Sequence, residues 1–121
     1  MSAGDWILAA LLGGLASFGR FLVDGIVSVR AGRELPFGTF VVNISGAVVL
    51  GLLTGLSLSG SQATLLGTAT VGSYTTFSTW MLETHRLYED GELVGAYANA
   101  AVSLIAGLGA AALGRSIGHA L

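Results

Sequence analysis

Long apolar runs separated by short polar connections dominate the sequence. Asp, Glu, Lys, Arg and His are all absent from residues 35–82 and again from residues 93–114. A helix that crosses a membrane needs about 20 mainly apolar residues. The pattern therefore predicts an all-α membrane protein with four transmembrane helices, at about residues 5–28, 37–58, 62–84 and 94–117, in a single domain spanning residues 1–121.

The connections between these spans are a basic segment at residues 30–36, a neutral turn at 59–61 and an acidic segment at 87–92. Such short connections make consecutive spans antiparallel neighbours and leave no room for a soluble domain. The first span follows Asp5, whereas a secretory signal peptide has positive charge ahead of its apolar stretch. We therefore expect the first span to be a retained helix.

Composition agrees with a location in lipid and argues against several functions. The chain is 53% hydrophobic and 10% charged, its formal net charge is −2, and its mean hydropathy is +0.79. This charge gives no basic surface for nucleic acid. There is no cysteine, and the two histidines lie near span ends without a patterned catalytic partner. We expect neither enzymatic activity nor a nucleic-acid partner.

Small residues recur every fourth position in three of the spans. Such rows let membrane helices approach closely, so packing is the expected role. The rows are Ala9, Gly13 and Ser17; Ala47, Gly51 and Gly55; and Gly114 with Gly118.

The third span carries a run of hydroxyl residues, Thr75 to Thr79 being the densest part, just after Gly72. This run favours a break in the helix at about residues 72–76, with an intact helix as the alternative. Irregular backbone in a membrane must be satisfied by protein or by a water-filled cavity, and such breaks commonly mark ion sites.

Two polar residues on one side of the second span are candidate pore residues. Asn43 lies mid-span, where an unpaired amide is costly, and Thr39 lies four residues earlier. Asn43 either faces a pore or joins two helices through a hydrogen bond. On the fourth span, Asn99 and Ser103 have the same spacing and are weaker candidates.

Phe77 and Trp80 share a helix face beside the polar run. Aromatic ring edges are electropositive, so two edges along a dry passage could coordinate a small anion; plain packing is the alternative. Arg20 and Asp24 are four residues apart and either neutralise each other or place Arg20 in an anion-attracting vestibule. Glu83 closes the third span and has an interfacial role as its simplest interpretation.

Motifs in all four spans resemble those of the Fluc/CrcB family of fluoride channels. The second span reads Gly-Thr at 38–39, then Asn43, then glycines at 46 and 51, and the third reads Thr-Thr-Phe-Ser-Thr-Trp at 75–80 followed by Glu83. The first span, from Gly14 to Arg20, and the fourth, with Ser103 and Gly107, are also similar. The motifs share the family's order, spacing and span count.

The resemblance implies a fluoride-selective passive channel that lets cytoplasmic fluoride leave the cell and so confers fluoride resistance. It implies an antiparallel, dual-topology dimer in the cytoplasmic (inner) cell membrane, with a structural sodium ion between the two third helices. The matching sodium ligands are the backbone carbonyls of Gly72 and Thr75. The matching anion path contains Phe77 and Asn43, and Trp80 replaces the family's usual second phenylalanine.

Two other functions fit a chain of this length. A small dual-topology multidrug exporter has the same helix count but needs an acidic residue in mid-span, which is missing here. An accessory membrane subunit without transport activity is the other.

The arginine distribution bears on the orientation of the chain. Arg30, Arg33 and Arg86 lie on one side and Arg115 on the other, which favours termini outside by a small excess. We expect a homodimer of dual-topology chains, with a heterodimer of oppositely oriented homologues as the alternative.

Overall fold

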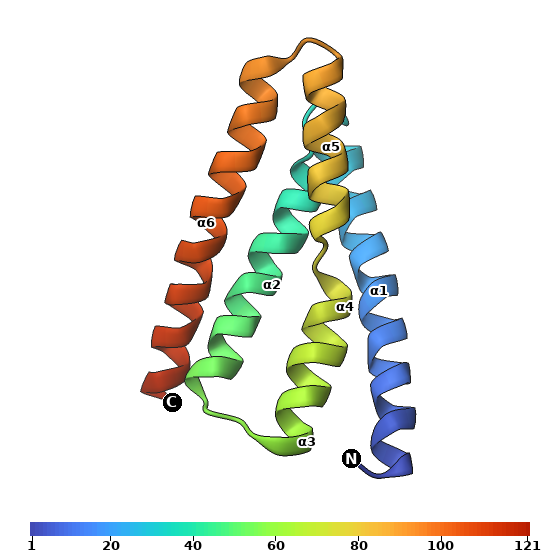
Figure 1. The fold of residues 1–121 in the computed structure, drawn as a ribbon, viewed down its shortest axis with the longest axis vertical. Coiled ribbons are helices and arrows are strands. Elements are labelled where there is room, and N and C mark those ends of the chain that lie inside the picture. The colour runs from blue at the N-terminus through green and yellow to red at the C-terminus, as the bar shows by residue number, and fades with distance from the viewer.

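The computed structural model describes all of residues 1–121, and every regular element is a helix (Figure 1). Three helices are long: α1 (Ala3–Ala31), α2 (Phe37–Gly55) and α6 (Leu93–Ala120). Between α2 and α6 the chain forms α3 (Gly60–Ala63), the π-helix η1 (Thr64–Val71), α4 (Gly72–Tyr74) and α5 (Phe77–Glu89). Both termini and α3 lie at one end of the bundle, and the α1–α2 and α5–α6 connections lie towards the other (Figure 1).

The helices α1, α2 and α6 are each long and apolar enough to cross a membrane. The helices α1 and α6 cover the predicted first and fourth spans, whereas α2 ends at Gly55, three residues before the expected end of the second span at residue 58. The third predicted span is η1 to α5, and α5 continues to Glu89, past the expected end at residue 84.

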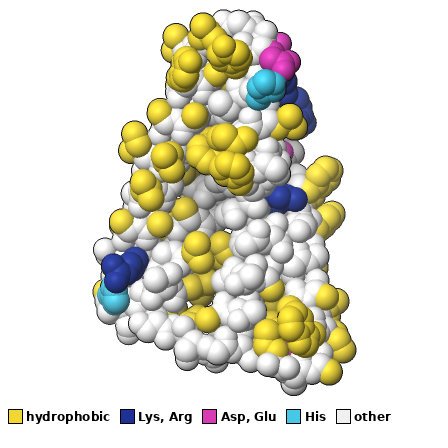
Figure 2. Space-filling view, in the orientation of Figure 1, with side chains coloured by type: hydrophobic (Ala, Val, Ile, Leu, Met, Phe, Trp, Pro, Cys, Tyr) yellow, Lys and Arg dark blue, Asp and Glu magenta, His cyan; other side chains and the backbone are white.

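The bundle buries few of its apolar side chains. Only five hydrophobic residues are buried, whereas large ones such as Leu15 and Ile105 are about two-thirds exposed (68% and 70%). Figure 2 shows charged side chains at only a few places on one face. This surface is suited to contact with lipid or another membrane chain, because a soluble monomer rarely exposes so much apolar area.

Glycines bring α2 and α6 into backbone contact. A Cβ atom at Gly51 would collide with the Ala111 carbonyl oxygen, and one at Gly114 would collide with the Val48 carbonyl oxygen. Cβ atoms at Gly55 and Gly118 would likewise collide with backbone atoms of the facing helix. The packing role predicted for these small residues is confirmed.

The third span is broken, as the sequence predicted, and the alternative of an intact helix is wrong. Thr75 and Thr76 have extended backbones (φ −79°, ψ 160° and φ −146°, ψ 119°). Thr76 then caps α5, because its Oγ1 accepts a hydrogen bond from the Thr79 N–H at 3.2 Å. Threonine therefore ends one helical segment and begins the next within two residues.

The segment before the break is also irregular. The hydroxyl of Thr70 donates to the carbonyl of Leu65, five residues earlier, at 2.7 Å, within the π-helix η1. The Thr75 hydroxyl donates to the Val71 carbonyl at 3.1 Å. These hydroxyl groups satisfy backbone groups within the bundle, as helix irregularities inside a membrane require.

Candidate functional site

Asn43 of α2 holds the break in place through two hydrogen bonds. Its Nδ2 donates to the Thr76 carbonyl at 2.9 Å, and its Oδ1 accepts from the Thr76 N–H at 2.8 Å. The break leaves an N–H donor and a carbonyl acceptor outside the helix, and a primary amide can pair with both. An amide nitrogen carries two hydrogens, and the second one has no partner in the protein.

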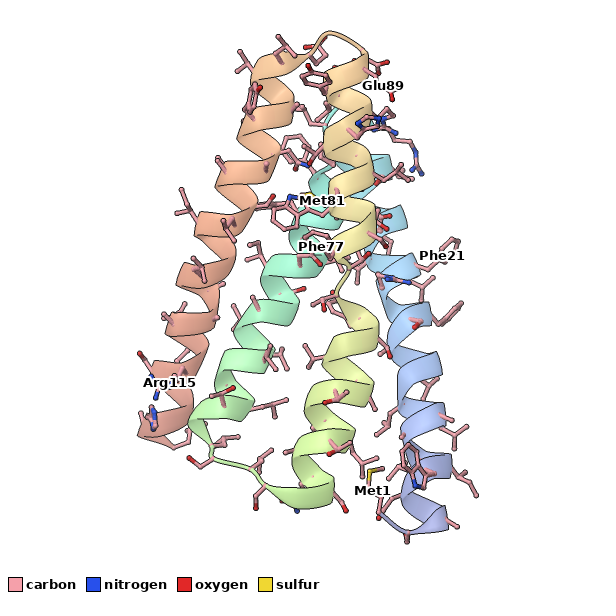
Figure 3. All side chains as sticks on the ribbon, in the orientation of Figure 1. Met1, Phe21, Phe77, Met81, Glu89 and Arg115 are labelled. Carbon is pink, nitrogen blue, oxygen red and sulfur yellow. The ribbon has the colours of Figure 1, made fainter.

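A cavity of about 300 Å³, which we call the break cavity, lies beside this junction. Its walls come from α2, the break, α5 and α6. Among the predicted site residues it contains Asn43, Thr75, Phe77, Trp80 and Ser103. The remaining wall is mostly apolar or small: Gly46, Ala47, Leu50, Thr76, Leu104, Gly107 and Leu108. Figure 3 shows Phe77 near mid-height of the bundle, at the start of α5.

Phe77 and Trp80 form an edge-to-face pair in the break cavity. Their ring centroids are 5.6 Å apart, and the ring planes make an angle of 86°. Phe77 is 70% exposed within the single chain. The indole Nε1–H of Trp80 donates to the Asn99 carbonyl on α6 at 3.0 Å. Because this bond occupies the N–H, Trp80 presents carbon ring atoms to the cavity, much as phenylalanine would.

Thr39 does not line the break cavity. It is buried, and its hydroxyl donates to Oε1 of Glu83 on α5. Thr39 instead lines a smaller cavity of about 150 Å³, the polar cavity, together with Arg20, Asp24, Thr76 and Thr79. Thr39 and Asn43, the two candidate pore residues of α2, therefore pair with different parts of the third span.

Arg20 and Asp24 do not form the ion pair that their spacing suggested. The ion pair in the structure joins His85 to Glu89 on α5. Asp24 accepts a hydrogen bond from Ser28 at 3.2 Å instead, and its carboxylate lies against Gly38 of α2. Arg20 and Asp24 thus both line the polar cavity without forming an ion pair with each other.

A third cavity of about 260 Å³, the end cavity, shares two lining residues with the polar cavity. Both contain Asp24 and Thr79, and the end cavity adds Glu83, Arg33 and Arg86. Thr76 likewise lines both the polar cavity and the break cavity. A row of three cavities therefore runs from a charged end of the bundle to the aromatic pair at mid-height, with threonines at each boundary.

The backbone near Gly72 and Thr75 has free hydrogen-bonding capacity. In a continuous α-helix the Thr76 N–H would bond to the Gly72 carbonyl, but here it bonds to Asn43. The Thr75 carbonyl lies in the extended break. Carbonyl oxygens are hard donors of the kind that alkali and alkaline-earth cations prefer.

Sequence reasoning missed the structural importance of Thr76, Tyr74 and Thr84. Thr76 is the partner of Asn43, and the Tyr74 hydroxyl lies 2.9 Å from the Ser45 hydroxyl. Thr84 accepts a hydrogen bond from the Asn99 amide at 2.7 Å. For Thr76 and Tyr74 the signal was their place in the predicted break, which does not indicate their partners on α2. For Thr84 the only signal was its position four residues after Trp80, and similar spacings occur throughout the chain.

Several known proteins are similar to this chain over nearly its full length. A "Fluoride-specific ion channel FluC 2" of Mycolicibacterium paratuberculosis is 55% identical, over 93% of this chain and 92% of its own. A "Fluoride-specific ion channel FluC 1" of Symbiobacterium thermophilum is 41% identical, over 94% of this chain and 97% of its own. A "Fluoride-specific ion channel FluC" of Syntrophotalea carbinolica is 40% identical, over 89% and 92%.

These relatives are named as ion channels, which are not enzymes. Together with the three helices of membrane-crossing length, they identify the chain as a multi-pass membrane protein. The model of the family described as "CrcB-like protein, Camphor Resistance (CrcB)" matches residues 7–115. This chain therefore belongs to the CrcB-like family.

Proposed function

We propose that this protein is a fluoride-selective channel that lets fluoride leave the cytoplasm passively and has no enzymatic activity. The observation that carries the proposal is 55% identity, over almost the whole chain, to a protein named as a fluoride-specific ion channel. A small multidrug exporter is not favoured, because the relatives of this chain are named as fluoride channels.

The break cavity offers a chemically reasonable path for a small anion. Fluoride that loses water needs hydrogen-bond donors or positive dipoles in return. The unpaired amide hydrogen of Asn43 and the Ser103 hydroxyl are such donors, and the edges of Phe77 and Trp80 are positive. In this proposal Thr39 and Glu83 lie on the approach from the end cavity, and Arg20 raises the local anion concentration.

The functional unit in this proposal is an antiparallel dimer of single-domain chains in the cytoplasmic membrane. The break cavity is open on one side, and Phe77 is largely exposed, so a second chain is needed to enclose the path. Arginines differ by only three to one between the two ends, which is compatible with insertion in both orientations. Relatives named both FluC 1 and FluC 2 keep a heterodimer of homologues as the alternative.

A structural sodium ion at the dimer centre is part of the same proposal. The carbonyls of Gly72 and Thr75 would hold it, because the first has lost its helical partner and the second lies in the extended break. A two-fold axis would double these ligands to four. The ion would supply positive charge at a point where the chain itself has only neutral groups.

The test is fluoride efflux from liposomes that contain only this purified protein, measured with a fluoride electrode. We expect rapid fluoride efflux and strong rejection of chloride in parallel vesicles, with protein-free liposomes as the control. Equal flux of the two anions contradicts selectivity, and no flux of either favours an accessory subunit. Reporter fusions after Leu121 test topology: signal on both sides of the membrane indicates dual insertion, and signal on one side requires an oppositely oriented partner.

A further inference from the structure

Trp80, Thr84 and Asn99 form a closed set of hydrogen bonds between α5 and α6. The indole Nε1–H of Trp80 donates to the backbone carbonyl of Asn99 at 3.0 Å, and the side-chain Nδ2 of Asn99 donates to Thr84 Oγ1 at 2.7 Å. Thr84 Oγ1 then donates to the Trp80 carbonyl at 2.8 Å. The two bonds made by Asn99 cross between the helices, so they hold α6 against α5 at Trp80.

The chemistry of the three groups determines the direction of each bond. The Thr84 hydroxyl has one hydrogen, which the Trp80 carbonyl receives because a carbonyl can only accept. The hydroxyl oxygen must therefore accept from Asn99, and only the amide nitrogen of Asn99 can donate. A reversed Asn99 amide would take the hydroxyl hydrogen of Thr84 away from the Trp80 carbonyl, so all three bonds exist together only in the arrangement seen here.

The position of the indole matters because it lies in the break cavity. Trp80 packs edge-to-face on Phe77, and both rings line the cavity. With its N–H bonded to α6, the indole cannot donate that hydrogen to an anion in the cavity. Rotation of the indole would both expose the N–H and remove the contact with Phe77.

We infer that Thr84 and Asn99 are positioning residues that hold the Trp80 indole in place, so that its ring carbons and not its N–H line the anion path. The part of this inference that concerns the anion rests on the proposed function. The part that concerns the indole's orientation stands on the hydrogen bonds alone. Neither Thr84 nor Asn99 lines the break cavity, so each acts through Trp80.

Tryptophan fluorescence provides a direct readout. Trp6 and Trp80 are the two tryptophans of the chain, and Trp6 is exposed on α1, so Trp6→Phe leaves Trp80 as the sole reporter. In this background Thr84→Val removes the hydroxyl at nearly constant volume, and Thr84→Ser retains it. Thr54→Val is the matched control, because Thr54 makes the same hydroxyl bond to a carbonyl four residues earlier, at 2.9 Å, without a partner on another helix.

We expect Thr84→Val to lower the fluorescence anisotropy of Trp80 and to reduce fluoride flux in liposomes about threefold to tenfold, as expected for loss of one or two hydrogen bonds within a membrane. Thr84→Ser and Thr54→Val should match the Trp6→Phe background in both measurements. Asn99→Ala, which removes the amide while leaving the Thr84 hydroxyl, should act like Thr84→Val and replaces it if that variant does not fold.

Unchanged anisotropy in both Thr84→Val and Asn99→Ala would overturn the positioning role. Lower anisotropy with undiminished flux would overturn the claim that the indole's orientation affects conduction. If Trp6→Phe protein carries no fluoride while native protein does, Thr84→Val and Asn99→Ala are made in the native chain, and their fluoride flux is compared with that of native protein. If native protein carries no fluoride, the proposed function fails, and anisotropy still decides whether Thr84 and Asn99 hold the indole.

Discussion

Replacing Asn43 by alanine tests whether the amide is what maintains the break. The substitution removes both hydrogen bonds to Thr76 and leaves the N–H and the carbonyl of that residue without partners. Asn43→Ala should therefore reduce both the stability of the break and the flux that depends on its geometry.

The expected size follows from hydrogen bonds measured in other membrane proteins, which average about 0.6 kcal/mol and reach about 1.7 kcal/mol. Two such bonds correspond to roughly 1–3 kcal/mol. Since about 1.4 kcal/mol is a factor of ten in an equilibrium, we expect the competent break geometry, and with it fluoride flux, to fall by about fivefold to a hundredfold.

The assay combines fluoride efflux from liposomes with denaturant unfolding in detergent micelles. Thr54→Ala is the control on the same helix, because the Thr54 hydroxyl is exposed and bonds only to its own helix. The proposed dimer should persist on size-exclusion chromatography, since Asn43 bonds within its own chain. Wild-type flux and wild-type stability in Asn43→Ala would refute the reasoning.

Substitutions at Phe77, Trp80 and Gly114 test other parts of the site and fold. Phe77→Ala should lower fluoride flux because it removes an electropositive ring edge from the break cavity, and the proposed dimer should stay intact; undiminished efflux would show that Phe77 only packs. Trp80→Phe should preserve conduction because the indole N–H faces α6, whereas Trp80→Ala should reduce it; normal efflux in Trp80→Ala would remove this position from the path. Gly114→Ala should lower the free energy of unfolding by about 1–3 kcal/mol by overpacking, because its Cβ would meet the Val48 carbonyl, whereas Gly109→Ala has open space and is the control. Equal unfolding midpoints for the two glycine variants would contradict the close contact between α2 and α6.

The sequence determined the helices and the location of the irregular segment. The uncharged runs have the length that membrane-crossing helices need. The hydroxyl groups from Thr75 onward can bond to backbone groups and so compete with the hydrogen bonds of the helix. Asn43 stood out for a similar local reason, because an amide within an apolar span must find a partner. These inferences need only composition and spacing along one helix.

Which groups meet depends on how the helices pack against one another. Asn43 pairs with a residue 33 positions later, Thr39 with one 44 positions later, and Trp80 with one 19 positions later. Such pairings depend on the rotation and offset of each helix, which the close glycine contacts between α2 and α6 help to set. The same dependence explains why Arg20 and Asp24, well spaced for an ion pair on one helix, remain apart: Asp24 bonds to Ser28 and packs against Gly38 of the neighbouring helix.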